Sequence, residues 1–364
     1  MTSEELQSKT INCLRFPLTA GVVLAHTVSD RDWLKEYIPH IDYTLLSGTD
    51  IYNLMRILLS DFIPRAVTVP CFFVFSGFLF FYKGKVWNRN IYFGKIKSRT
   101  KTLVIPYLLW NIIPLALAAL FAFMRFDGSL SELMSKLQEN GIFTIFWNYS
   151  CDGSVSYPYN IPMWYVRDLI VAAFCSPLVY YFVKYAKLIG VVILGVSYVL
   201  LTGMGIWFPL VMFFFTLGAW LAVHGKNMVV ESRKGKWFWF CCLIVTLILS
   251  VYCLGTDKFG YIFALCNVSG SITMINIASR LIERGRVAIH PFLTQTSFFI
   301  YAVHGGILWK CNQALNILFD STGIPVLTLK YFLAPAVCVC ICVGVYWVAG
   351  KTVPKLLSIL TGSR

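Results

Sequence analysis

The sequence predicts an all-α fold: a polytopic integral membrane bundle of about ten transmembrane helices, with both termini in the cytoplasm. Hydrophobic residues form 58% of the 364-residue chain, charged residues form only 13%, and the mean hydropathy is +0.70. Soluble globular domains are about half apolar and about a quarter charged. Apolar stretches of about 20 residues also recur along the chain, and this is the helix length that crosses about 30 Å of hydrocarbon. The segments between these stretches alternate between basic and acidic, and this alternation predicts which of them face the cytoplasm.

The apolar stretches divide into ten predicted spans. They cover residues 11–28, 60–82, 103–124, 162–183, 188–203, 206–224, 237–254, 259–279, 293–311 and 329–350. Two longer segments, about 29–59 and about 125–161, are then expected on the outer side of the membrane. The pattern predicts a single transmembrane domain over residues 1–364, without a soluble domain.

The net charge of +14 is explained by topology. Most lysines and arginines fall in segments predicted to face the cytoplasm, above all in a basic loop at about 83–102, and most acidic residues fall on the other side. This is the charge bias of cytoplasmic loops in membrane proteins. We therefore expect a multi-pass protein of the bacterial cytoplasmic (inner) membrane, with membrane lipids rather than nucleic acid as the partners of its basic surface.

The cysteine pattern predicts neither disulfides nor a metal site. Nearly all of the twelve cysteines lie inside predicted spans. Cys338, Cys340 and Cys342 alternate along one span, so their thiols spread around the helix instead of converging on one point. Zinc sites normally use paired cysteines at wider spacing.

Two ionisable residues, Arg15 and His26, interrupt the first predicted span. They are eleven residues apart, close to three helical turns, so they lie on nearly the same face and about 16 Å apart along the axis. A charged side chain near the bilayer centre costs about 2.5–3.5 kcal/mol or more, which favours a functional reason for its presence. A neutral imidazole suits a general base because its pKa lies near working pH. The alternative is that Arg15 flanks the inner interface and His26 lies at the outer water boundary.

Small and basic residues form a second group of candidates. Ser76 and Gly77 make a small-residue notch in the second span, which suits either helix packing or the approach of a ligand to the backbone. Arg99 and Lys101 lie at the end of the basic loop. They act either as a positive-inside anchor or as a phosphate-binding surface, since arginine forks and lysine charges pair with phosphate oxygens.

Polar and aromatic residues in two later spans complete the candidates. They are Trp164, Tyr165, Arg167 and Asp168 in "IPMWYVRDLIV", and Tyr301 and His304 in "SFFIYAVHGG". Trp164 and Tyr165 are typical interfacial anchors. Arg167 and Asp168 suit either structural ion pairs or substrate positioning. His304 is either a satisfied packing group or a second imidazole in the bundle that already holds His26.

These motifs together resemble the acyltransferase-3 family of bacterial multi-span membrane acyltransferases. The resemblance rests on Arg15 and His26 and on "FFVFSGFL", "IPYLLWN", "PMWYVRDL" and "SFFIYAVH", which run in the family's order from residue 11 to about residue 305. It implies an O-acetyltransferase type of activity that moves an acyl group, expected to be acetyl, from cytoplasmic acyl-coenzyme A. The acceptor would be a hydroxyl of a cell-surface glycan such as an exopolysaccharide, of a lipid-linked sugar or of peptidoglycan. Acyl-coenzyme A would be a co-substrate, with no bound cofactor.

The resemblance also implies roles for individual residues. His26 matches the family's essential histidine and Arg15 its arginine partner, so His26 would be the general base. Arg99 falls at the first position of an R-x-x-R pair, with Thr102 at the second position and Lys101 beside it. Arg99, Lys101 and the Ser76-Gly77 notch would form the acyl-donor site. The residues alone leave open a proton-coupled transporter or flippase of a solute or glycan intermediate, because such a pathway also uses buried ionisable groups.

Overall fold

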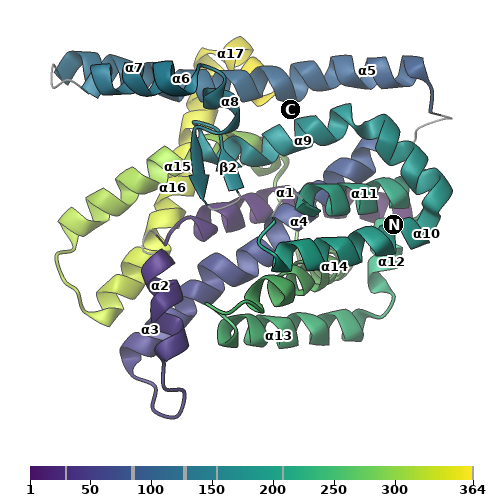
Figure 1. The fold of residues 1–364 in the computed structure, drawn as a ribbon, viewed down its shortest axis with the longest axis horizontal. Coiled ribbons are helices and arrows are strands. Elements are labelled where there is room, and N and C mark those ends of the chain that lie inside the picture. The colour runs from purple at the N-terminus through teal and green to yellow at the C-terminus, as the bar shows by residue number, and fades with distance from the viewer. Residues whose placement is uncertain (29–30, 83–86, 126–128, 153–154, 207–208, 363–364) are drawn as a thin grey trace. The chain divides into compact units, whose positions relative to one another are not determined.

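The computed structural model describes residues 1–28, 31–82, 87–125, 129–152, 155–206 and 209–362 (Figure 1). Nearly all regular structure in these residues is helical. The chain divides into two compact units, one of residues 1–85 and 178–347 and the other of residues 86–177 and 348–364. We call them unit 1 and unit 2.

Unit 1 contains most of the long helices. They are α1 (Ser3–Ala25), α2 (Arg31–Tyr37), α3 (Gly48–Arg56), α4 (Ile63–Phe81), α10 (Ser176–Gly203), α11 (Pro209–Val223), α12 (Met228–Arg233), α13 (Lys236–Tyr252), α14 (Phe259–Glu283), α15 (Pro291–Leu318) and α16 (Ile324–Thr352). A 3-10 turn, η1 (Ile38–His40), follows α2, and a π-helical turn, η2 (Ile57–Phe62), joins α3 to α4. The last residues of α16 belong to unit 2.

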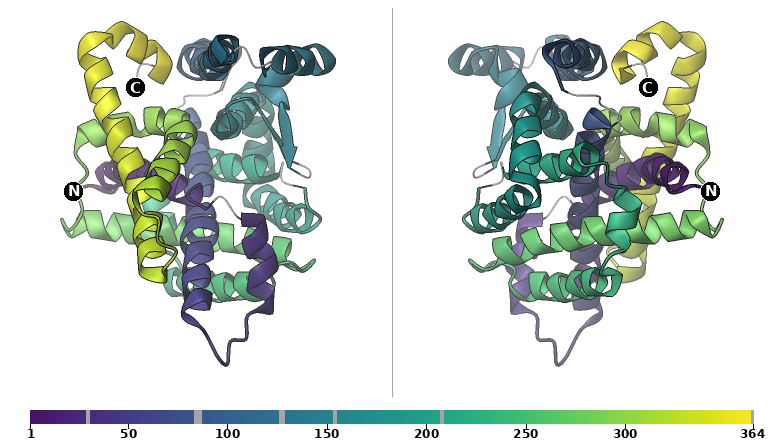
Figure 2. Two further views of the ribbon diagram at one scale, coloured as in Figure 1. Left: turned by 90° about the vertical axis from the view of Figure 1, so that its left-hand side faces the viewer. Right: turned by 90° about the vertical axis from the view of Figure 1, so that its right-hand side faces the viewer.

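Helix α4 is the packing centre of unit 1, because α1, α11 and α14 all lie against it (Figure 1). Small residues make these contacts close. A Cβ on Gly77 of α4 would overlap the carbonyl oxygen of Phe215, and one on Gly218 of α11 would overlap the carbonyl oxygen of Val74. Where α14 crosses α4, a Cβ on Gly270 would lie 2.9 Å from the carbonyl oxygen of Ala66. Helix α13 packs in turn along α14, beside which it runs in the further views (Figure 2).

The first turns of α1 are held by polar contacts with α12 and the segment before it. Thr2 and Glu5 form a reciprocal cap that starts α1, with 3.2 Å from the Glu5 amide nitrogen to the Thr2 hydroxyl oxygen. The Gln7 side-chain oxygen accepts from the Met228 amide at 2.6 Å, and the Asn227 amide group donates to the Ser3 carbonyl at 2.9 Å. The N-terminal end of α1 is thereby fixed to its neighbours.

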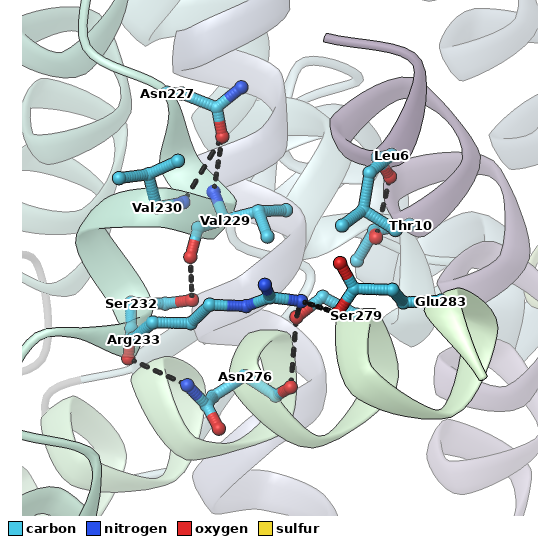
Figure 3. Close-up of polar contacts among 10 residues, drawn as sticks. All are labelled: Leu6, Thr10, Asn227, Val229, Val230, Ser232, Arg233, Asn276, Ser279 and Glu283. Atoms are coloured by element: carbon cyan, nitrogen blue, oxygen red, sulfur yellow. Dashed lines mark hydrogen bonds and ion pairs between the residues drawn. The ribbon is translucent and has the colours of Figure 1, made fainter. Parts of the chain in front are cut away.

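Helices α12 and α14 are joined by the polar contacts drawn in Figure 3. The Asn276 amide donates to the Ser232 carbonyl at 3.1 Å. Arg233 pairs with Glu283 at 2.8 Å and reaches the Ser279 hydroxyl at 3.4 Å. We call these five residues, together with Gln7, Asn227 and Met228, the polar joint.

Unit 2 contains the remaining elements. They are α5 (Arg89–Arg99), the π-helical turn η3 (Thr100–Val104), α6 (Ile105–Arg125), α7 (Ser129–Asn140), α8 (Thr144–Trp147), β1 (Ser150–Asp152), β2 (Val155–Tyr157), the 3-10 turn η4 (Ile161–Met163), α9 (Trp164–Phe174) and α17 (Pro354–Thr361). Strands β1 and β2 form an antiparallel hairpin in which Cys151 lies opposite Ser156. This hairpin is the only sheet in the part of the chain that the structure describes.

Five helices among the described residues are long and apolar enough to cross a membrane. They are Gly48–Phe81, Arg89–Met124, Ser176–Gly203, Phe259–Glu283 and Ile324–Thr352. Two shorter apolar helices, Pro209–Val223 and Lys236–Tyr252, accompany them. These findings agree with an all-α membrane protein, while the number of ten spans and the cytoplasmic termini stay predictions.

The structure differs from the predicted element boundaries at several points, and the second predicted span, for example, is part of a continuous helix that starts at Gly48. The basic segment 83–102 is helical from Arg89 onward, because the Asn88 side chain caps α5 by accepting from the Ile91 amide at 2.9 Å. Lys83 and Lys85 of that segment lie outside the described residues. The predicted span 162–183 is interrupted after Phe174, and α10 restarts at Ser176.

Proline and a backbone kink explain where the helices around residue 180 begin and end. Pro177 lacks an amide N–H, and its ring would clash with the carbonyl four residues earlier in a continuous helix. Helix α10 is itself broken at Lys187, which has φ 50° and ψ −138°. The break at Lys187 lies between the two predicted spans 162–183 and 188–203, where the sequence predicts a break between helices.

Candidate active site

His26 lies at the C-terminal end of α1 with its side chain exposed. Its amide donates to the Val23 carbonyl at 3.1 Å, and its φ of −99° and ψ of 5° end the helix. Val23 and Ala25 are buried against the bundle, whereas His26 is accessible. The helix thus presents an imidazole at an open edge of unit 1.

His304, on α15, is fully buried and lies beside His26. The ring centroids of the two histidines are 5.3 Å apart and the rings are tilted by 44°. Nδ1 of His304 lies 2.8 Å from the Tyr301 carbonyl oxygen and 3.2 Å from the Ile300 carbonyl oxygen. The Tyr301 ring lies 6.2 Å from the His304 ring, so the structure brings His26, Tyr301 and His304 together.

An apolar wall surrounds the His304 side of this cluster. Val23 of α1, Ile300 of α15 and Ala334 of α16 pack in one buried group. Cys338 and Cys342, also on α16, belong to the same group, and the Cys338 thiol donates weakly to the His304 carbonyl at 3.8 Å. A low-polarity wall of this kind strengthens hydrogen bonds made inside it.

Arg15 lies on α1, eleven residues before His26, and is partly exposed. Its carbonyl accepts from the Thr19 hydroxyl at 2.9 Å. The helical rise of about 1.5 Å per residue separates Arg15 from His26 by about 16 Å. The two residues therefore occupy different depths of unit 1.

The Ser76-Gly77 notch faces α11. Gly77 is buried where the α4 and α11 backbones meet, and this contact accounts for the glycine by helix packing. Ser76 is half-buried beside it.

Arg99 and Lys101 lie at the junction of α5 with the π-helical turn η3. Tyr165 of α9 is close enough to interact electrostatically with the Arg99 guanidinium. Lys101 is exposed. The backbone of Thr102 packs against the end of α17, where a Cβ on Gly362 would overlap the Thr102 carbonyl oxygen. Within unit 2, Arg99, Lys101 and Tyr165 therefore gather near one helix junction.

Arg167 holds the β1–β2 hairpin onto α9. Its guanidinium donates to the Trp147 carbonyl at 2.7 Å and to the Ser156 carbonyl at 2.8 Å. Its Nε pairs with Asp168 at 2.8 Å, and its charge lies over the Trp147 ring at 5.1 Å from the centroid. These partners occupy the guanidinium, which favours a structural role. Trp164 is half-buried at the start of α9.

Sequence analysis gave no role to the asparagine that ends "IPYLLWN". Asn111 is fully buried, its side-chain oxygen accepts from the Asn160 amide at 3.0 Å, and its amide group donates to the Tyr107 carbonyl at 2.8 Å. The Asn160 side chain donates to the Trp110 carbonyl at 2.8 Å. These bonds tie α6 to the segment that enters α9. The sequence signal that could have identified Asn111 is its position: it is a polar residue inside the predicted apolar span 103–124.

The candidate residues divide between the two units. Unit 1 contains Arg15, His26, Ser76, Gly77, Tyr301 and His304, and unit 2 contains Arg99, Lys101, Trp164, Tyr165, Arg167 and Asp168. The structure brings together the imidazole cluster in unit 1 and the junction around Arg99 in unit 2.

The helices and the imidazole cluster define the class first: a helical membrane protein with ionisable groups inside its bundle. A family model described as an acyltransferase domain, the acyltransferase-3 model, matches residues 8–348. The chain belongs to this family of membrane acyltransferases.

Comparison with curated proteins adds one relative. The succinoglycan biosynthesis protein ExoH of Rhizobium meliloti (strain 1021) is 23% identical over 364 residues, which cover 98% of this chain and 92% of that protein. No solved structure matches the chain.

Proposed function

We propose that this protein transfers an acyl group, acetyl in the simplest case, from cytoplasmic acyl-coenzyme A to a hydroxyl of an exopolysaccharide or of its lipid-linked precursor. Family membership supports acyl transfer, and the full-length likeness to a succinoglycan biosynthesis protein supports a polysaccharide acceptor. The observation that carries the proposal is the exposed imidazole of His26 beside the buried imidazole of His304. Both termini are cytoplasmic in this proposal, and the protein lies in the inner membrane.

The reaction begins at His26. A ring nitrogen of His26 takes the proton of the acceptor hydroxyl, and the oxygen attacks the carbonyl carbon of the thioester. The tetrahedral intermediate collapses when its C–S bond breaks, and the coenzyme A sulfur leaves with the proton that His26 received. The products are the acyl ester and free coenzyme A, so atoms and protons balance.

The basic candidates bind the donor in this proposal. Coenzyme A carries phosphates, and arginine and lysine side chains pair with phosphate oxygens, which makes Arg15 in unit 1 and Arg99 and Lys101 in unit 2 separate candidates for donor binding. The Ser76 hydroxyl contributes a further polar contact to the donor, and Gly77 sets the helix spacing around it. Charge on the oxygen of the tetrahedral intermediate requires a hydrogen-bond donor beside His26.

The test measures release of the coenzyme A thiol by the purified full chain in nanodiscs, with acetyl- and succinyl-coenzyme A as separate donors and a surface-glycan extract as acceptor. We expect extract-dependent release, with about a 10²- to 10⁴-fold loss in His26→Ala. His40→Ala is the matched control, because His40 is an exposed histidine at the end of η1. Undiminished release by His26→Ala would overturn the role of His26, and no release with any donor would overturn the acyl transfer.

A further inference from the structure

A buried polar atom beside His26, Nε2 of His304, has no role in the proposed reaction. The residue has 0% of its surface exposed, and this nitrogen has no hydrogen-bond partner among the described residues. A buried polar atom without a partner costs about 1–3 kcal/mol. Such an exception in an otherwise apolar wall requires an explanation.

The two carbonyls next to Nδ1 determine which nitrogen of His304 carries the proton. A carbonyl oxygen only accepts hydrogen bonds, so the short contacts to Tyr301 and Ile300 require a proton on Nδ1. In the neutral ring, Nε2 is then a hydrogen-bond acceptor. Because Nδ1 faces back along α15, Nε2 lies on the side of the ring away from the α15 backbone.

The groups around His304 show which donor can meet this acceptor. Tyr301 lies on the same helix, one turn earlier, and Cys338 of α16 directs its thiol to the His304 backbone carbonyl. Cys342 follows one turn later on α16. From α1 the facing titratable group is His26, whose ring lies 5.3 Å from that of His304. At this separation the structure has no hydrogen bond between the two rings, but a small turn of the exposed His26 side chain would bring a ring nitrogen within hydrogen-bond distance of Nε2.

We infer that the exposed His26 side chain turns toward His304 and donates a ring N–H to its unpaired Nε2, so that His304 acts as the positioning residue for the base. The bond holds the proton on the His26 nitrogen that faces His304, so the other ring nitrogen is the one that takes the acceptor's proton. It also stabilises the imidazolium that forms when His26 does so. Exposure decides which histidine is the base and which is the positioning residue, because substrate can reach the exposed His26 but not the fully buried His304. This role rests on the proposed function, but the hydrogen bond itself does not.

Two substitutions of His304 distinguish the effect of losing the Nε2 acceptor from the effect of losing the packing of the ring. His304→Asn keeps an amide near Nδ1 that can donate to the Tyr301 carbonyl, and it lacks an acceptor at Nε2. His304→Gln places its amide oxygen near Nε2. We expect kcat to fall about 10- to 100-fold in His304→Asn with an unchanged KM for the acyl donor, and His304→Gln to recover most of that loss, as for other residues that orient a catalytic group. His224→Asn is the control, because it removes a ring nitrogen that lies 2.9 Å from the Val183 carbonyl oxygen.

Nitrogen NMR of protein labelled with ¹⁵N-histidine tests the hydrogen bond without any turnover. The chain has five histidines, and His26→Asn and His304→Asn assign the two that matter. At neutral pH we expect His304 protonated on Nδ1 only and His26 in one tautomer. We expect His26 to become a mixture of tautomers in His304→Asn and to regain one tautomer in His304→Gln.

The two measurements distinguish this inference from the proposed function. A proton on Nε2 of His304, or a His26 tautomer that is unchanged in His304→Asn, would overturn the inference. Equal losses of kcat in the Asn and Gln variants would also overturn it. The expected NMR result with no thiol release in the native chain would confirm the hydrogen bond and refute the acyl transfer.

Discussion

The contact between α4 and α11 makes a strong prediction about Gly77. A Cβ at this position would overlap the carbonyl oxygen of Phe215, and the obstacle is backbone, which cannot rotate away as a side chain could. The reciprocal contact of Gly218 with Val74 prevents the helices from sliding to relieve it. Overpacking of a close-packed interior costs about 1–3 kcal/mol, and a backbone obstacle places Gly77→Ala at the upper end, about 3 kcal/mol.

The measurement is the thermal unfolding midpoint of the purified protein in detergent, at fixed protein and detergent concentrations. We expect a drop of several degrees for Gly77→Ala. The control is Gly344→Ala in α16, because an added Cβ there meets nothing within 4 Å and alanine is the better helix former. Equal midpoints for the Gly77 variant and the native chain would show that the close approach of α4 and α11 does not require a glycine.

Two further predictions concern charged contacts. Arg167→Met leaves the Asp168 carboxylate, whose side chain is only 14% exposed, without its 2.8 Å partner. Loss of one partner of a buried ion pair costs about 3–5 kcal/mol, and this change should fall at the lower end because Asp168 is not fully buried. Cleavage of the β1–β2 hairpin in limited proteolysis should therefore become faster. The double change with Asp168→Asn should recover part of the stability, and no recovery would contradict the pairing. Burial raises the pKa of Glu231, but the hydrogen bonds and charges of Lys234 and Lys226 outweigh it, so the pKa lies below its ordinary value. The folded state then binds fewer protons than the unfolded state at acidic pH, and stability that is present at neutral pH is lost as the pH falls below about 4. Glu231 is partly exposed, so the loss should be only a few tenths of a degree to about one degree in the unfolding midpoint, and Glu231→Gln should flatten this part of the pH profile; an unchanged profile would refute the assignment.

The sequence was a good guide to the helices and a poorer guide to their ends. Hydropathy located the apolar segments because burial in lipid or protein requires them, and this signal does not depend on tertiary contacts. The interruption near Pro177 was missed because hydropathy carries no information on a missing amide donor. The helix beginning at Arg89 was taken for a loop because charge, rather than the cap at Asn88, dominated its interpretation.

Candidate residues could be identified from the sequence by chemical type, but not by contact. Intramembrane position singled out His26, Arg167 and His304 without showing which of them meet. Only the three-dimensional structure places the His26 and His304 rings 5.3 Å apart, across 278 residues of sequence, and gives Arg167 its backbone partners. Sequence analysis did not identify Asn111, because its role depends on a hydrogen bond with Asn160, which is distant in the chain.

The contacts along α1 explain how one apolar helix can hold the proposed base, His26, in place. The polar joint fixes its first turns through Gln7 and Met228 (Figure 3 shows the α12–α14 part of the joint). Further along, a Cβ on Gly21 would lie 2.9 Å from the Thr68 side chain of α4, so the middle of α1 is also closely packed. A helix held at its start and its middle cannot slide or rotate freely, so the position of His26 at its end is also restricted. Because a displacement of about 1 Å can cost a catalyst about 10²-fold in rate, substitutions in the polar joint should lower kcat although they are far from the imidazole.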